Sequence, residues 1–233
     1  MAALTRDEVL GFYNSLPFEH HPLWRAILSG TLSYQQVLMA EQQHFIRSNI
    51  GRSFREKAAR DSADLSPKAH ALLMETYYEE CTDDETGPSH VALIERLLVE
   101  GGKSEAEIRN AIPTAGNSAA IALYKDIGDR GPLHHMIAAG AVEYFYSGLS
   151  PKIFSAYQQH YGMSEHQAET YKIHGPMDRQ HAERALSILD DAQVVSMAES
   201  IRYAVRDAFV ATSLHYDGML QAALGKITYW SGL

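Results

Sequence analysis

The sequence predicts an all-helical protein, and three observations support this prediction. Apolar residues recur at spacings of three and four, as at Val37, Phe45 and Ile46, which is the period of a helix with one buried face. Helix-capping signals open successive segments, and we recognise no alternating strands or hairpin signals. The chain has 233 residues, of which 45% are hydrophobic, so it can bury a sizeable core. We therefore expect one all-α domain over residues 1–233.

The boundaries of the expected helices follow from local capping chemistry. Thr5, Ser33, Ser104 and Ser164 each stand three residues before Glu or Gln, the spacing of a capping box. Ser66-Pro67 and Ser150-Pro151 combine an N-cap with proline at the first helical position. Gly101-Gly102 ends the helix that begins at His90. The expected helices span residues 5–15, 21–29, 33–60, 66–80, 90–100, 104–111, 117–128, 132–149, 151–161, 164–174, 177–190 and 192–223.

Composition excludes several classes of protein. Twenty basic residues against 29 acidic ones give a net charge of −9, and no Lys/Arg run forms the basic face that nucleic-acid binding requires. The single cysteine, Cys81, excludes an internal disulfide and a cysteine-only metal site. We find no signal-peptide core and no apolar run long enough for a membrane span. We therefore expect a soluble cytoplasmic protein with neither a nucleic acid nor a membrane as partner.

The densest group of chemically active residues is the segment from His174 to His181, which has the pattern H-x3-D-x2-H. On a continuous helix His174, Asp178 and His181 fall within roughly a 60° arc. Two imidazoles and a carboxylate on one stripe suit iron or manganese. Pro176 interrupts the pattern, so His174 could instead end one helix while the other two begin the next. A solvated polar face is the alternative interpretation.

Two carboxylates elsewhere lie among apolar residues. Glu41 stands on the apolar stripe of the first long helix, and Glu143 is the one charged residue of the segment 138–146. Burying an unpaired carboxylate costs several kcal/mol, and neither stripe offers a Lys or Arg within a turn. A pair of metal ions would supply the compensating charge; a distant Arg or protonation is the alternative. Glu79 or Glu80, together with His90, brackets a turn between two helices.

In combination these features resemble the haem-oxygenase-like diiron oxidases and oxygenases. The shared pattern is a carboxylate on the first long helix, a Glu before a Pro-x-His turn, a later helical Glu and H-x3-D-x2-H, over residues 20 to 220. The resemblance implies a haem-oxygenase-like bundle of seven or more helices, the fold of thiaminase II and pyrroloquinoline-quinone synthase. It implies iron ligands at Glu41, Glu79, His90, Glu143, His174, Asp178 and His181, with Glu80 as the alternative to Glu79.

The same resemblance implies an activity. Two iron ions, or manganese in their place, would activate dioxygen as cosubstrate to oxidise a small organic molecule. Amino acids or amines are the expected substrates, and N-oxygenation, desaturation or C–C cleavage the expected reactions. The resemblance also implies a homodimer and allows an external electron donor.

Four alternatives predict different sites. A ferritin-like bundle would use the acid-x-x-His segments at Glu41–His44 and Asp178–His181. Haem binding would use an axial histidine at His20 or His21. A metal-free member of the fold, a thiaminase-like hydrolase or a cofactorless oxidase, would depend on Cys81 or a Tyr/His pair. A non-catalytic interaction protein would use the acidic loop 79–86 as its contact surface.

Overall fold

The computed structural model describes residues 3–83 and 87–232, and within these ranges the regular structure is helical, with no strand. Short 3-10 turns at Phe12–Ser15, Phe18–His20 and Asp61–Asp64 connect some of the helices. The α-helices are α1 (Arg6–Gly11), α2 (Pro22–Leu28), α3 (Tyr34–Arg60), α4 (Pro67–Cys81), α5 (His90–Glu100), α6 (Glu105–Arg109), α7 (Ala115–Asp129), α8 (Pro132–Tyr161), α9 (Glu169–Leu186), α10 (Ala192–Ser196) and α11 (Ala198–Leu224). The prediction of an all-α fold is confirmed.

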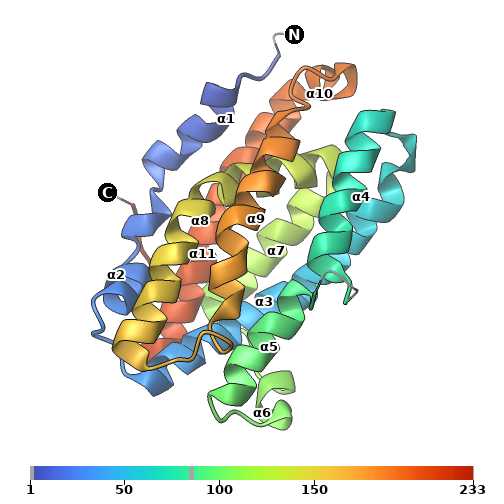
Figure 1. Ribbon diagram of the computed structural model, residues 1–233. Coiled ribbons are helices and arrows are strands. Elements are labelled where there is room, and N and C mark those ends of the chain that lie inside the picture. Colours follow the sequence, from blue (N-terminus) through green and yellow to red (C-terminus); the bar gives the residue numbers. More distant parts are fainter. Residues whose placement is uncertain (1–2, 84–86, 233) are drawn as a thin grey trace.

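The long helices form a bundle. Helices α8 and α9 pack side by side along much of their length, and α11 packs against α3, α7 and α8 (Figure 1). Helices α4 and α5 follow one another along the bundle, where each contacts both α3 and α9. Helices α3, α4, α5, α8 and α9 therefore converge on one region inside the bundle. No helix of the described residues is long and apolar enough to span a membrane.

The capping signals place most helix starts within a residue or two of those observed. Thr5, Ser33 and Ser104 form complete capping boxes, and Ser66 and Ser89 accept hydrogen bonds from backbone amides of the first turn. These side chains satisfy amide donors that have no partner within the helix itself.

Three predicted boundaries are wrong. Residues 132–149 and 151–161 form one helix, α8, which continues through Pro151. Helix α9 begins at Glu169 rather than residue 164 and continues through Pro176 to Leu186. Ser164 does accept a hydrogen bond from the Gln167 amide, at 2.9 Å, but this bond closes a turn before the helix. The last predicted helix is divided at Met197 into α10 and α11.

Close packing of α8 against α9 accounts for both continuous helices. A proline inside a helix costs about 3 kcal/mol, and burial of the shared α8–α9 interface offsets that cost. Gly175 allows α9 to lie close to α8 near Pro151 and Pro176, because a Cβ at position 175 would lie 3.0 Å from Pro151 Cγ. Gly140 does the same further along, where a Cβ would lie 2.4 Å from the Cβ of Ala185. The two glycines therefore set the spacing between the helices that carry most of the candidate ligands.

Candidate metal centre

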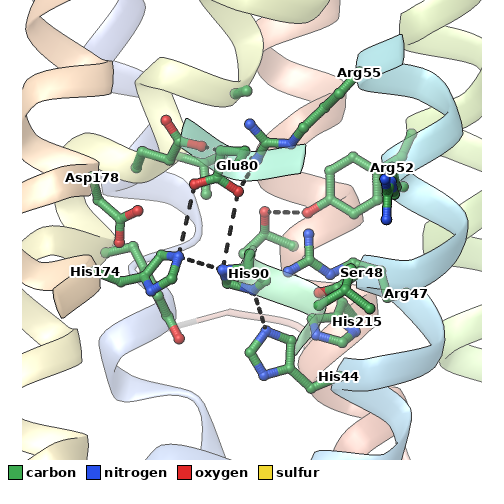
Figure 2. A pocket seen from close by; sticks show the side chains of 18 of the residues that line it. His44, Arg47, Ser48, Arg52, Arg55, Glu80, His90, His174, Asp178 and His215 are labelled. Carbon is green, nitrogen blue, oxygen red and sulfur yellow. Dashed lines mark hydrogen bonds and ion pairs between the residues drawn. The ribbon is translucent and has the colours of Figure 1, made fainter. Parts of the chain in front are cut away.

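Four helices bring carboxylates and imidazoles together inside the bundle. Glu80 comes from the last turn of α4 and His90 from the first residue of α5. Glu143 comes from the middle of α8, and α9 contributes His174, Asp178 and His181. Because α9 is continuous, these last three residues share one buried face, as the helical spacing predicts. Figure 2 shows Glu80 between Arg55 and the imidazoles of His90 and His174.

Glu80 is common to two groups of side chains that could each hold a metal ion. One group is Glu80, His90 and His174, and the other is Glu80, Asp178 and His181; within each, one ligand atom per residue lies within 4.8 Å of the others. The Glu80 Oε1 atom lies 3.7 Å from His174 Nε2 and 3.5 Å from His181 Nδ1. Its Oε2 atom lies 4.0 Å from His90 Nδ1. Glu143 Oε2, 3.7 Å from His181 Nδ1, adjoins the second group.

Hydrogen bonds leave one free ring nitrogen on each histidine of α9. His174 Nδ1 donates to the Thr170 carbonyl at 2.7 Å, so the nitrogen facing Glu80, Nε2, carries a lone pair. His181 Nε2 donates to Glu79 at 2.9 Å, and Nδ1 is the ring nitrogen that faces Glu80 and Glu143. His181 Nδ1 is buried and makes no hydrogen bond with the described residues. Metal-binding histidines commonly show this arrangement, with one nitrogen held by an acceptor and the other free for the metal.

A chain of three residues fixes the orientation of His90. His44 Nδ1 donates to Glu41 Oε2 at 3.1 Å, so His44 Nε2 accepts a hydrogen bond from His90 Nε2 at 3.3 Å. His90 Nδ1 is then unprotonated and lies in direct contact with the unprotonated Nε2 of His174. Two lone pairs that face each other repel, and a metal ion that accepts both of them removes the repulsion. The chain Glu41–His44–His90 therefore presents a nitrogen pair suited to a metal ion.

The structure places Glu41 elsewhere than the expected ligand position. Its carboxylate is fully buried and accepts hydrogen bonds from the hydroxyls of Tyr157 and Tyr171 as well as from His44. These three donors occupy its oxygens, and Glu41 belongs to neither metal-binding group. No Lys or Arg lies near Glu41 in the sequence, and hydroxyl and imidazole donors stabilise its buried carboxylate in place of a metal ion.

The structure also favours Glu80 over Glu79. Glu79 is partly exposed and binds Arg184 and His181 at 2.5 and 2.9 Å. Glu80 is buried, with 5% of its surface exposed, and points into the cluster. Burial raises the pKa of Glu80, but Arg55 and the imidazoles of His174 and His181 outweigh burial and lower that pKa to about 2. Glu80 is therefore an ionised carboxylate at neutral pH.

The carboxylates of the cluster differ in their partners. Arg55 from α3 lies 3.2 Å from Glu143 and 3.5 Å from Glu80, so part of the compensating charge comes from a distant arginine. Asp178 has no such partner in the described chain, and its buried Oδ2 atom makes no hydrogen bond there. Burial raises the pKa of Asp178 well above its usual range, and the nearby Glu143 and Glu80 raise it further. Asp178 Oδ2 and His181 Nδ1 are the donor atoms that a bound metal would satisfy, so these residues fit a metal site.

A cavity of about 120 Å³ adjoins the cluster. His90, Glu143, His174 and Asp178 form the side with the candidate ligands, and α3 and α11 line the opposite side. Trp24, Tyr146, Tyr216 and Met219 contribute apolar surface. A small molecule held there would lie directly against the candidate metal ligands.

Comparison with known proteins places this chain in a family. Residues 57–212, which include Glu80, His90, Glu143 and the three candidate ligands of α9, match the family described as iron-containing redox enzymes. The chain belongs to that family. No curated protein matches the chain.

Solved structures of similar fold support the architecture. A domain of unknown function with a heme oxygenase-like fold from Shewanella denitrificans has a TM-score of 0.74 and 16% identity, covering 92% of this chain and 90% of its own. A CadD-like protein of unknown function from Nostoc punctiforme has a TM-score of 0.72 and 18% identity, with 95% and 98% coverage. A TenA family transcription regulator from Silicibacter has a TM-score of 0.68 and 15% identity, with 93% and 94% coverage. The prediction of a haem-oxygenase-like fold is confirmed.

The residues that the alternative interpretations of this iron-containing redox family member would use are not arranged for those roles. His21 accepts from the Leu23 amide and donates to Asp217, which occupies both ring nitrogens and leaves none for haem, while His20 is exposed. Cys81 is buried, and burial raises its pKa to about 11, so its thiol is a poor nucleophile. Of the acidic loop 79–86, residues 84–86 lie outside the described part of the chain, and Glu79 and Glu80 pair with interior residues.

Arg55 was missed as part of the site, and His44 was considered only as a ligand of the ferritin-like alternative. On α3, His44, Ser48, Gly51 and Arg55 follow one another at spacings of four, three and four, which places them on one helix face. All four line the cavity. The helical spacing alone could have placed them together, but the identity of the facing helix could not be predicted.

Proposed function

We propose that this protein is a dioxygen-dependent, non-haem diiron oxidoreductase that oxidises a small organic molecule bound in the cavity. One ion would be held by Glu80, His90 and His174, and the other by Glu80, Asp178 and His181 with Glu143 beside them. The proposed ligand set replaces Glu41 and Glu79 of the sequence-based expectation with Glu80, and it retains the other five residues.

The observation that carries the proposal is the position of Glu80 in both groups. A carboxylate has two oxygens and can bridge two cations, and mixed imidazole and carboxylate donors suit iron and manganese. Membership in an iron-containing redox family supports iron as the metal. The unpartnered Asp178 Oδ2 and His181 Nδ1 support a second ion in addition to the first.

When bound, a pair of ferrous ions supplies electrons and coordination positions for the reduction of dioxygen. The protein's own residues set the conditions for that chemistry. The α9 stripe and Glu80 hold their donors within a buried cluster, and the Thr170 carbonyl and Glu79 orient the imidazoles. The apolar side of the cavity limits access of water to the reacting group.

Oxygen uptake tests the proposal. The protein is loaded anaerobically with ferrous iron, exposed to dioxygen, and followed with an oxygen electrode and by iron analysis. We expect iron-dependent uptake that is abolished in His174→Ala and Asp178→Ala, because each variant removes a ligand of one ion. Arg60→Gln, at the exposed C-terminal end of α3, is the matched control and should keep uptake and iron content. Full activity in the two alanine variants without iron would contradict the proposal.

A further inference from the structure

Arg47 is a cation of the cavity wall that has no anionic partner among the described residues. It lies on α3, lines the cavity, and forms no ion pair or hydrogen bond within that part of the chain. Its buried Nε atom is therefore an unsatisfied donor, while its guanidinium lies 5.8 Å from the centre of the Tyr124 ring. The other arginines of this wall differ, because Arg52 pairs with Glu56 and Arg55 with Glu80 and Glu143.

Ser48 presents a second donor beside Arg47. Its side chain is buried, with 8% of the residue exposed, and its hydroxyl makes no hydrogen bond with the described residues. Figure 2 shows Arg47, Ser48 and His215 close together on the opposite side of the cavity from Asp178. Leaving two buried donors unsatisfied is costly, so a ligand that accepts from both would be stabilised there.

His215 adds an acceptor to the same wall, and its protonation follows from its partners. The Asn117 side-chain amide donates to the Gln43 carbonyl at 2.9 Å and to Gln43 Oε1 at 3.0 Å, so Asn117 Oδ1 is an acceptor. His215 Nδ1 must then donate to Asn117 Oδ1, at 2.9 Å. Burial and the nearby Arg47 hold the pKa of His215 well below its usual range. The neutral ring therefore has a lone pair on Nε2.

We infer that Arg47, Ser48 and His215 form a recognition site for the carboxylate end of a small substrate. The guanidinium and hydroxyl donate to the carboxylate, and His215 Nε2 accepts from an amino or hydroxyl group next to it. The rest of the molecule extends towards His174 and Asp178 on the other side. The assignment of this ligand as a substrate rests on the proposed function, whereas its binding does not.

The volume of the cavity indicates the size of ligand that it holds. A water molecule needs roughly 10–15 Å³ of cavity volume, so about 120 Å³ accommodates on the order of ten non-hydrogen atoms. A 2-amino or 2-hydroxy acid of the size of leucine fits this volume.

Calorimetric titration of the full chain with three matched compounds tests the inference. The compounds are L-leucine, 4-methylpentanoate and 4-methylpentanamide, which share a carbon skeleton and differ in carboxylate and amino groups. Each is titrated into anaerobic ferrous protein and again after chelation. We expect 4-methylpentanoate to bind more tightly than the amide by roughly tenfold or more, as for a charge-assisted hydrogen bond, and L-leucine to bind at least as tightly as 4-methylpentanoate.

Variants identify the residues responsible. Arg47→Gln should weaken carboxylate binding by roughly tenfold or more, and Arg47→Lys should restore part of it. Arg60→Gln, at the exposed end of α3 and away from the cavity, should leave it unchanged. His215→Gln should remove the advantage of L-leucine over 4-methylpentanoate. Thermal unfolding of each variant checks that it is folded.

Three results would overturn the inference: equal binding by wild type and folded Arg47→Gln, equal binding of the acid and the amide, or binding by none of the compounds. Carboxylate binding that disappears on chelation would also overturn it, because the metal would then be the anchor. Arg47-dependent binding in a protein that takes up no iron would contradict the proposed function and leave the recognition site intact.

Discussion

Glu79 and Glu80 are adjacent in the sequence but have different partners. One step along a helix rotates a side chain by about 100°, which turns Glu79 towards Arg184 and Glu80 into the cluster. The buried residues of α4 include Ala69, Leu73 and Glu80, and the spacings of four and seven place them on one face. The sequence alone does not distinguish the two glutamates, because Leu72 stands seven residues before Glu79 just as Leu73 stands seven before Glu80. The burial of Ala69 and Leu73 in the structure decides between them.

Substitution of each glutamate separates the two roles. Glu80→Gln removes a ligand charge shared by both metal groups, so we expect it to lose stoichiometric binding of both ions. Glu79→Gln weakens only the orienting bond to His181, and we expect a loss of roughly 10- to 100-fold in metal affinity with an unchanged stoichiometry. Anaerobic ferrous titration measures both quantities. Loss of both ions in Glu79→Gln, with full binding in Glu80→Gln, would reverse the assignment.

Glu41 illustrates why a buried carboxylate alone does not identify a ligand. The sequence correctly indicated that Glu41 is buried, but Tyr157 and Tyr171, which satisfy it, are more than 100 residues away. Only the tertiary structure shows that it acts on His90 through His44.

Glu41→Gln tests this indirect role. Its amide can donate to His44 Nδ1 and so disfavour the tautomer that leaves His90 Nδ1 free. We expect metal affinity to fall by roughly 10- to 100-fold while two ions still bind at saturation, as measured by anaerobic titration. A stoichiometry reduced to one ion, with His44→Ala unaffected, would show that Glu41 is itself a ligand.

At the scale of helices, the positions of α8 and α9 determine the site. The stripe of His174, Asp178 and His181 was predictable because it depends on helical spacing within one segment. The continuity of both helices through Pro151 and Pro176 was not, because it depends on the packing of one helix against the other. A proline in the sequence favours the end of a helix nearby, but packing between the two helices overrides that preference here.

Two glycines of α8 provide a matched test of this packing. Gly140→Ala places a methyl group 2.4 Å from Ala185 Cβ, and overpacking costs about 1–3 kcal/mol against about 1 kcal/mol gained in helix propensity. We expect a net loss of stability and weaker metal binding, because Glu143 moves away from α9. Gly148→Ala meets no atom within 4 Å and should gain up to about 1 kcal/mol. Denaturant unfolding compares the two, and equal gains would contradict the packing argument.

Across the whole molecule, many ionisable groups are buried in the bundle. Burial lowers the pKa of His21, His134 and His215 below the usual range, and that of His135 to about 3. Composition shows 12 histidines but not which of them are buried. The partners of Arg55 are equally hidden in the sequence, because Glu80 and Glu143 lie on other helices. The sequence could therefore predict the fold class and part of the ligand set, but not this charge arrangement.

The buried histidines make stability depend on pH. Below pH 6.5 the unfolded chain binds protons at these positions while the folded chain does not, so stability falls as pH falls. Each histidine contributes up to about 1.4 kcal/mol per pH unit. The raised pKa of Asp178 has the opposite effect on stability. It involves one proton, whereas the buried histidines together involve several. We expect metal-free protein to lose stability from pH 7 to pH 5 in urea unfolding; constant or rising stability would contradict this.

Anomalous X-ray diffraction at the iron edge, from crystals grown anaerobically with ferrous iron, tests the central claim most directly. The claim is that Glu80 is a ligand shared by two metal sites, which are formed by residues of α4, α5, α8 and α9. We predict two anomalous peaks per chain, one beside His90 and His174 and one beside Asp178 and His181, both in contact with Glu80. A single peak, no peak, or a peak bound to Glu41 or Glu79 instead of Glu80 would contradict the account.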